Sequence, residues 1–414
     1  MAETAVVSAA LSADPPVLSI VENAPTRFAS VELFAGAGGL ALGCQAAGFE
    51  SIATLERDRW ACDTVRENKE RGHELVEDWN VYEGDVRDFD WSVVTKDVDL
   101  VAGGPPCQPF SSGGLGRAAD DARDMFPATA EIIARLRPRA FIIENVRGLT
   151  RSAFADYYAY IQLRLALPTL RAKPGERWME HLLRLRAAID RRERYALSYR
   201  VAPTLVNAAD FGVPQQRHRV FFVGFRGDLD VDWTFPAASH SKRALLRSQW
   251  VTGEYWDEHE VPANKRPERP SFRIPGLFSD DMPKQRWRTV RDALIGLPKP
   301  ALRPSRLVLN HVLQPGARSY PGHTGSPLDM PAKALKAGGH GVPGGENMLR
   351  DVDGAVRYFT VRESARLQTF PDDYELHGSW GEAMRQLGNA VPVLLGQVVA
   401  ESVHQALVKE RISS

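Results

Sequence analysis

The sequence predicts an α/β protein with a Rossmann-like, mixed but mostly parallel sheet and a smaller, loop-rich second domain. Between residues 28 and 145, short apolar strands alternate with helical stretches, and a glycine-rich turn follows the first strand. This alternation requires a mostly parallel sheet with helices on both faces. Beyond Arg226, prolines and tryptophan–arginine pairs dominate to about residue 350, a composition typical of irregular structure.

The individual elements follow from apolar runs and their stop signals. Pro138 ends one helix, because proline cannot continue the hydrogen bonding of a helix. A helical insertion over 152–193, rich in Arg and Leu, has no assigned task. Strands are expected at 28–34, 51–56, a short segment ending at 85, 98–102 and 140–144, with sheet-edge strands at 195–205 and 220–225. Helices are expected at about 39–48, 58–70, 126–137, 361–367 and 391–408.

Four segments are expected along the 414 residues. Residues 1–27 form a disordered leader, 28–226 the domain with the glycine turn, 227–380 the loop-rich domain with a hinge, and 381–414 a C-terminal helix that completes the first domain. The chain has 52 basic and 52 acidic residues, so its formal net charge is zero. Any binding of a polyanion must therefore come from a local patch.

One basic patch is visible between residues 261 and 320. It holds twelve basic residues and four acids, and twelve minus four leaves an excess of +8. Such an excess suits a surface that contacts phosphates, and a solvated basic face is the equally good alternative. The basic residues are Lys265, Arg266, Arg269, Arg273, Lys284, Arg286, Arg288, Arg291, Lys299, Arg303, Arg306 and Arg318.

Three cysteines, Cys44, Cys62 and Cys107, form neither a disulfide framework nor a zinc motif. They predict no metal site and fit a reducing cytosol. The first residues lack the basic and apolar regions of a signal peptide, and no stretch reaches the roughly 18 apolar residues of a membrane span. We therefore expect a cytoplasmic protein with no membrane partner.

Cys107 follows a rigid turn. The strand before it runs into two glycines and then Pro105-Pro106, which fix φ near about −65° and remove two backbone donors. A thiol held in this way, before a small-residue loop over 111–116, is a candidate nucleophile beside a loop that closes over a substrate. The alternative is a strand-end turn with an incidental cysteine, since most free cysteines are buried and inert.

The glycine-rich turn lies where open α/β sheets bind ligands. Its spacing, Gly-x-Gly-Gly, leans away from the dinucleotide pattern, although an NAD site or a plain tight turn are alternatives. Glu56 ends the second strand, where a carboxylate can accept both hydroxyls of a ribose. Asp85 ends the third, where it can accept from an adenine amino group. Each acid alone reads as a solvated strand-end residue, but with the turn they describe an adenosine pocket without a phosphate clamp.

The run Gly-Pro-Pro-Cys-Gln-Pro-Phe-Ser over 104–111 resembles the catalytic motif of the DNA cytosine-C5 methyltransferases. The glycine turn, Glu56 and Asp85 resemble the family's first three motifs, and the matches follow its linear order over roughly 28–225 and 357–396. The resemblance implies duplex DNA as partner and S-adenosyl-L-methionine as cofactor. The residues expected to hold this cofactor are Phe34, Gly36, Gly38, Gly39, Leu40, Glu56, Arg57, Asp85, Val86, Pro106, Asn389 and Ala390.

The expected catalytic residues are Cys107, Glu144, Arg217 and Arg219. A Cys107 thiolate can add to C6 of cytosine if Glu144, with a raised pKa, protonates N3, and the activated C5 then takes the methyl group. Gln215-Gln216-Arg217-His218-Arg219 matches the family's Gln-x-Arg-x-Arg motif, and its arginines at i and i+2 of an extended segment point the same way. Either arginine could hold the base O2 or position the thiol and Glu144; a solvated edge pair is the alternative.

Two further motifs resemble the end of the family pattern. Residues 386–392 resemble its last motif, a turn into the C-terminal helix that returns to the cofactor pocket, and 361–374 resemble the penultimate motif, which organises the second domain. The family's Thr-Leu pair near the end of the recognition region is replaced by Ala334-Leu335, which puts one DNA contact in doubt. The glycine-rich run 338–345 is expected to form a loop close to DNA.

Rival functions differ in specific residues. An amino-group methyltransferase needs an Asp/Asn-Pro-Pro-aromatic loop, which this chain lacks. A tRNA-directed relative of the same fold lacks a large recognition domain, and a non-enzymatic DNA-binding regulator would need a helix-turn-helix that 1–27 cannot form. We therefore expect a monomeric DNA cytosine-C5 methyltransferase that flips its target base. The family's usual role is modification in a restriction-modification system, with an endonuclease encoded nearby that need not bind.

Overall fold

The computed structural model describes residues 27–106, 124–269, 284–304, 307–337 and 345–413. Four predicted features lie wholly or mostly outside these residues: the leader, Cys107 with the loop 111–116, Arg273 with Arg306 of the basic patch, and the glycine-rich run 338–345.

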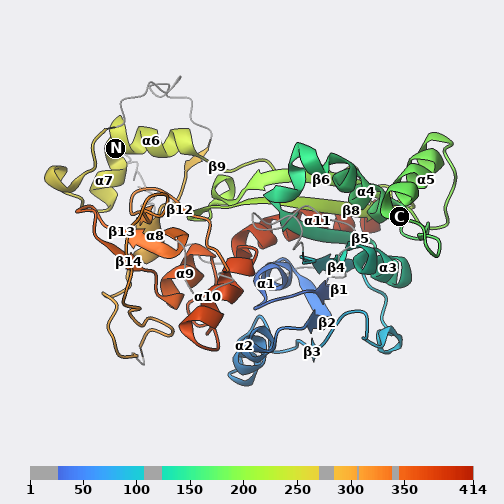
Figure 1. Ribbon diagram of the computed structural model, residues 1–414, viewed down its shortest axis with the longest axis horizontal. Helices are drawn as coiled ribbons and strands as arrows, with labels where there is room; N and C mark the ends of the chain where they lie inside the picture. The colour runs from blue at the N-terminus through green and yellow to red at the C-terminus, as the bar shows by residue number, and fades with distance from the viewer. Residues whose placement is uncertain (1–26, 107–123, 270–283, 305–306, 338–344, 414) are drawn as a thin grey trace, which may run out of the picture.

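A seven-stranded mixed sheet confirms the predicted α/β class (Figure 1). Its strand order is β3-β2-β1-β4-β5-β8-β6; the pairs from β3 to β5 are parallel, and β8 is antiparallel to both neighbours. Because β6 covers its outer side, β8 is an interior strand, and the prediction of an edge strand at 220–225 is wrong. The strands are β1 Phe28–Leu33, β2 Phe49–Glu56, β3 Val81–Glu83, β4 Leu100–Gly103, β5 Ala140–Val146, β6 Tyr199–Asn207 and β8 His218–Arg226.

Helices cover both faces of this sheet, because its strands carry apolar side chains on both sides. Phe141 and Ile143 pack in one core with α3, α4 and α5, whereas Ala140 and Ile142 pack in another with α1 and α11. Gly43 lets α1 and α11 approach closely, since a Cβ there would lie 2.5 Å from the backbone nitrogen of Gln397. These helices are α1 Gly39–Ala46, α2 Arg59–Glu70, α3 Phe126–Leu136, α4 Ala155–Ala166, α5 Trp178–Asp190 and α11 Val393–Ser413.

The loop-rich domain has short elements, as the sequence predicts. It contains helices α6 Lys242–Trp250, α7 Glu254–Glu258, α8 Val290–Leu294 and α9 Val361–Leu367, and strands β9 His240–Ser241, β10 Gln285–Arg286, β11 Ser326–Pro327, β12 Ala332–Lys333, β13 Met348–Arg350 and β14 Val356–Tyr358. Short 3-10 turns occur at Trp91–Val93, Arg147–Thr150, Ser152–Phe154, Ala208–Phe211, Ala263–Lys265 and Gly345–Asn347.

Helix α10 Trp380–Asn389 precedes α11, whereas the sequence predicts one C-terminal helix in 381–414, with regular helical signals only from residue 391. The side chain of Ser379 caps its first turn, and the buried Ala383, Met384 and Leu387 form its inner face. This face lies in one apolar core with residues of α1, α2, α8 and α9. In Figure 1, α9 and α10 accordingly lie between the sheet and the loop-rich domain.

The C-terminal helical stretch passes a test of length and composition for a membrane span. Trp380–Ile412 is long and apolar enough by length and composition, but 61% of its most apolar window is buried inside the protein. A core helix passes the same test, so this stretch is weak evidence for a span.

Three arginines of the predicted basic patch are occupied within the loop-rich domain. Arg286 donates to Asp292 and Glu258, and Arg291 donates to Asp329. Arg266 lies 3.7 Å from a carboxylate oxygen of Asp257. Three of these acids lie just outside the 261–320 window, so the excess charge available to an external ligand is smaller than the local count predicts.

Glu32 makes a testable contribution to stability. This side chain of β1 is buried, accepts a hydrogen bond from the Ser30 hydroxyl at 2.9 Å, and has its pKa raised to about 7 by burial. A folded-state pKa above the unfolded value means that the protonated acid supports the fold at low pH, and that this support is lost as pH rises through 7.

We expect Glu32→Gln to raise the free energy of unfolding by roughly 1–3 kcal/mol at pH 8, with a much smaller gain at pH 5, because the amide never has to ionise in the core. Denaturant unfolding at the two pH values measures this difference. An equal effect at both would show that Glu32 does not titrate across this range.

Candidate functional site

The glycine-rich turn leaves the sheet where the strand order reverses. β1 lies between β2 and β4, so the connections from these strands diverge on opposite sides and leave a crevice at their carboxyl ends. Phe34 and Gly36 have φ of 54° and 56°, and Gly38 has 97°, so the turn folds back sharply after Leu33. A Cβ built on Gly36 meets nothing within 4 Å, so the space above this residue is open.

Glu56 ties this turn to the end of β2. Its Oε2 accepts from the backbone nitrogen of Gly36 at 2.8 Å, and its Oε1 accepts from those of Arg57 and Asp58 at 2.7 Å. The carboxylate is therefore held in one orientation beside the open space over Gly36. Both lone pairs of Oε1 are used by these bonds, and one lone pair of Oε2 remains for a further donor.

Asp85 lies at the end of the neighbouring strand β3, as predicted. It accepts two hydrogen bonds from the guanidinium of Arg87, at 2.9 and 2.7 Å, and one from the backbone nitrogen of Arg87. The side-chain bonds from Arg87 lower the pKa of Asp85 to about 2, so the acid is ionised at neutral pH. The sequence does not predict this pairing, because the direction of the Arg87 side chain depends on the conformation of the turn after β3.

The other predicted cofactor residues divide between the crevice and the packing beneath it. A Cβ on Gly39 would lie 2.3 Å from the carbonyl oxygen of Val391 and 3.1 Å from Cβ of Ala390, so the turn after α10 presses directly on the start of α1. Leu40 packs against Gly396 of α11. Val86 is buried, whereas Arg57, Pro106 and Asn389 are exposed.

Glu144 and Arg219 form a buried pair at the carboxyl edge of the sheet. Glu144 lies on β5 and Arg219 on the adjacent β8, with Glu144 Oε1 and Arg219 Nε 2.5 Å apart but not aligned for a hydrogen bond. Burial raises the pKa of Glu144, and the charges of Arg219 and Arg217 oppose this shift. A carboxyl group in this setting keeps its proton to higher pH than an exposed glutamate does.

The turn that leads to Cys107 lies against this pair. A Cβ on Gly104 would come within 3.0 Å of Glu144 Oε2, and Asn145 Nδ2 donates to the carbonyl of Pro105 at 3.1 Å. β5 therefore supplies both the carboxyl group and the amide that holds the turn. The described part of this turn ends at Pro106, one residue before Cys107, which lies outside the described residues.

Arg217, the other arginine of the predicted pair, has different partners. Its guanidinium is buried and donates to the carbonyls of Leu335, at 3.0 Å, and Gly388, at 2.6 Å. It lies close enough to Glu144 and Arg219 for their charges to act on it. Of the two arginines, Arg219 therefore pairs with Glu144, and Arg217 binds backbone from two other segments.

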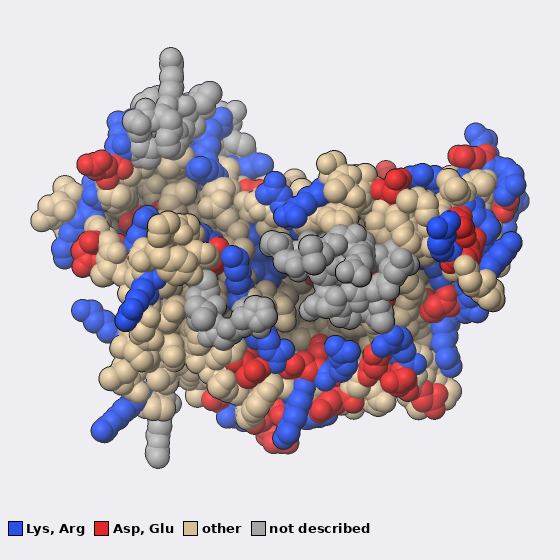
Figure 2. Space-filling model, in the orientation of Figure 1, with Lys and Arg blue, Asp and Glu red and all other residues tan. Residues whose placement is uncertain are grey.

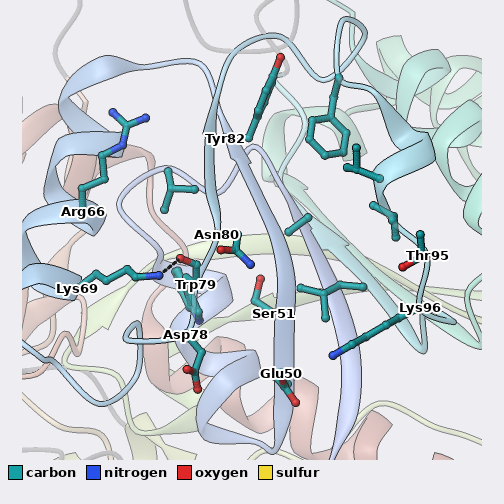
Figure 3. A pocket seen from close by; sticks show the side chains of 16 residues that line it. Glu50, Ser51, Arg66, Lys69, Asp78, Trp79, Asn80, Tyr82, Thr95 and Lys96 are labelled. Carbon is teal, nitrogen blue, oxygen red and sulfur yellow. Dashed lines mark hydrogen bonds between the residues drawn. The ribbon is translucent and has the colours of Figure 1, made fainter.

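Two candidate binding features lie away from this edge. A cavity of about 660 Å³ borders the amino-terminal half of β2 and includes Ser51, Tyr82 and Lys96; none of the predicted site residues lines it (Figure 3). Glu258, His259 and Asp292 bring their ligand atoms within 4.8 Å of one another, as a metal site would require. Arg286 already donates to both carboxylates, which makes this group an ion-pair network.

The comparisons with known proteins agree with this arrangement. The family model described as C-5 cytosine-specific DNA methylase matches residues 28–162, 193–289 and 323–405. This chain belongs to the C-5 cytosine-specific DNA methylase family. The unmatched segment between residues 162 and 193 falls within the predicted helical insertion, where α5 lies.

Alignments with individual relatives cover most of this methylase. It is 31% identical to the type II methyltransferase M.NgoMIV of Neisseria gonorrhoeae over 387 residues, covering 93% of this chain and 99% of the relative. It is also 31% identical to M.Eco47II of Escherichia coli over 382 residues, covering 92% and 79%. As a member of this family, the protein is a DNA cytosine-C5 methyltransferase.

Solved structures support the fold. The S. pombe Dnmt2 methyltransferase aligns with a TM-score of 0.52 and 17% identity, covering 93% of this chain and 99% of that one. The Entamoeba histolytica methyltransferase EhMeth aligns with a TM-score of 0.52 and 13% identity, covering 92% and 99%. The Rossmann-like methyltransferase architecture predicted from the sequence is confirmed.

Proposed function

We propose that this methyltransferase transfers a methyl group from S-adenosylmethionine to C5 of a cytosine flipped out of duplex DNA, through a covalent adduct with Cys107. The observation that carries the proposal is the buried Glu144–Arg219 pair beside the Gly104–Pro106 turn, one residue from Cys107. A carboxyl group of raised pKa and a nucleophile at one edge of the sheet are what this chemistry requires.

Each step of the reaction assigns a task to a residue of this edge. The Cys107 thiolate adds to C6 while Glu144 donates its proton to N3, so the ring becomes an enamine with an electron-rich C5. The cofactor supplies an electrophilic methyl carbon, and transfer to C5 breaks its carbon–sulfur bond. Loss of the C5 proton to a base that these residues do not identify, such as a water molecule, expels the Cys107 thiolate, and N3 returns its proton to Glu144.

The charges around Glu144 suit this cycle. Burial favours the protonated acid that the first step needs, whereas Arg219 stabilises the carboxylate that forms once the proton has moved to N3. Arg219 Nε lies 2.5 Å from Glu144 Oε1, so its charge acts directly on the carboxyl group that donates the proton.

The crevice at the switch point fits the adenosine part of the cofactor. Open space over Gly36 lies beside the fixed carboxylate of Glu56, and Asp85 ends the next strand. Gly36 gives its backbone N–H to Glu56, so this donor is not available to a phosphate. Glu56 and Asp85 would hold the ribose and the adenine amino group, with Phe34 at the edge of the turn.

The DNA is expected to lie between the sheet domain and the loop-rich domain. Figure 2 shows Lys and Arg side chains bordering the hollow between these two parts of the molecule, where phosphates could approach. Base reading would belong to residues 227–380, because a pocket closed around one flipped base cannot contact neighbouring pairs. Since the bacterial relatives are named type II methyltransferases, we infer a cytoplasmic, monomeric modification enzyme of a restriction-modification system.

The nucleophile is tested by Cys107→Ser. We expect the variant to lose methyl transfer to duplex DNA while it retains cofactor binding, because the serine hydroxyl stays protonated at neutral pH and is a much weaker nucleophile than a thiolate. A duplex containing 5-fluorocytosine should trap the wild type as a covalent adduct, visible by mass spectrometry. Cys44→Ser and Cys62→Ser, which alter buried cysteines, are the matched controls and should remain active.

The comparison of substrates separates the alternatives. Transfer of labelled methyl groups to tRNA in place of DNA would favour the tRNA enzyme, and DNA binding without transfer would favour the regulator. Full activity of Cys107→Ser with no trapped adduct would overturn the mechanism.

The cofactor pocket is tested by Glu56→Ala and Asp85→Ala. Each should weaken binding of S-adenosylmethionine by roughly 1–3 kcal/mol, the usual cost of leaving polar partners unpaired. Lys96→Ala, in the cavity beside β2, is the control and should bind normally. Isothermal titration measures all three; normal affinity in both acid variants would place the cofactor elsewhere.

A further inference from the structure

We infer that Arg217 is a positioning residue that latches the recognition segment 332–337 to the turn after α10, and so couples DNA binding to cofactor binding. This inference rests on the proposed function. It assigns Arg217 a role distinct from contact with the base, although the residue lies two positions from Arg219.

The first half of the latch joins the sheet domain to the recognition segment. Strand β7, Gln215–Gln216, pairs in parallel with β12, and the side-chain oxygen of Gln215 accepts from the backbone nitrogen of Leu335 at 3.0 Å. Arg217 Nη1 donates a hydrogen bond to the carbonyl of the same Leu335. Both backbone groups of Leu335 are therefore held by side chains from the strand entry of β8.

The second half joins the same arginine to the cofactor side. Arg217 Nη2 donates a hydrogen bond to the carbonyl of Gly388. The recognition segment passes closely over Gly388, since a Cβ built on this glycine would lie 2.3 Å from the backbone nitrogen of Ala337. Two residues further, Ala390 and Val391 press on Gly39 at the start of α1. One row of contacts thus runs from the recognition segment through Arg217 to the turn that forms the cofactor crevice.

The chemistry of Arg217 fits this task better than a purely stabilising one. Its guanidinium is buried against two neutral carbonyls, and burying a charge in this way is expensive unless the arrangement itself is needed. A planar fork with several donors can bind two carbonyls from different segments at once, which a lysine ammonium cannot do with the same geometry. A shift of either segment would break one of these bonds.

The test measures the coupling directly. S-adenosylhomocysteine should tighten binding of target DNA to the wild type at least fivefold, a factor typical of coupling between two sites. In Arg217→Lys this factor should fall below two, while the affinities for DNA alone and for S-adenosylhomocysteine alone stay within threefold of the wild type. Because lysine keeps a positive charge near Glu144, the pH dependence of kcat should be unchanged.

Two matched variants separate the latch from catalysis and from general loss of structure. Arg219→Lys should lower kcat but keep the coupling, since this side chain pairs with Glu144 and not with the two segments. Arg186→Lys, at an exposed ion pair on α5, should leave both unchanged.

A second measurement needs no variant. Hydrogen exchange of peptides that cover 332–337 in the wild type should slow when S-adenosylhomocysteine binds. Three results would each overturn the inference: a wild-type coupling factor in Arg217→Lys, no effect of S-adenosylhomocysteine on DNA binding in the wild type, or a hydrogen-exchange rate at 332–337 that is the same with and without S-adenosylhomocysteine. Methyl transfer and Cys107 trapping by the wild type are read separately, so a failure of the proposed function would be recognised as such.

Discussion

The site depends on one constraint, the parallel arrangement of five neighbouring strands with a reversal of order at β1. Because β3, β2, β1, β4 and β5 run the same way, every segment that follows them emerges at one edge. Gly103 pairs with Ile143 in register, so Gly104 and Glu144 must be neighbours. A Cβ on Gly104 would be 3.0 Å from Glu144 Oε2, so a larger residue there would press on the carboxyl group.

The antiparallel strand β8 adds the charge that this edge would otherwise lack. Its register pairs Arg219 with Val146 and Phe221 with Glu144, so Arg219 and Glu144 are diagonal neighbours on adjacent strands. A buried carboxyl group and a buried guanidinium each cost several kcal/mol to desolvate, so neither would persist without the other or without a function that uses both. Glu144 Oε1 and Arg219 Nε lie 2.5 Å apart, so each group is the charge partner of the other.

The loop-rich domain relies on polar contacts as much as on apolar packing. Asp292 accepts from the backbone nitrogen of Thr289 at 2.6 Å and from Arg286, and lies 3.0 Å from His259. Trp287 donates to Asp210 of the sheet domain at 2.9 Å. The bonds of Asp292 hold the domain together internally, whereas the Trp287–Asp210 bond and the β7–β12 pair anchor it to the short connection between β6 and β8.

The sequence by itself determined the class of fold, the order of the strands along the chain and the residues that meet at the sheet edge. Strand periodicity and the side of the sheet on which a strand ends are local properties, so Glu56, Asp85 and Glu144 could be placed from the pattern alone. The partners of charged side chains could not be predicted in this way. The sequence places Arg286 and Arg291 in a basic patch that suits phosphate contacts or a solvated face equally well, and only the folded domain shows that they donate to neighbouring carboxylates. The interior position of β8, the helix α10 and the two carbonyl partners of Arg217 were likewise decided by tertiary structure. β8 is interior because β6 pairs with its outer side, α10 is held by the packing of several helices into one core, and both carbonyls that Arg217 binds lie more than a hundred residues away along the chain.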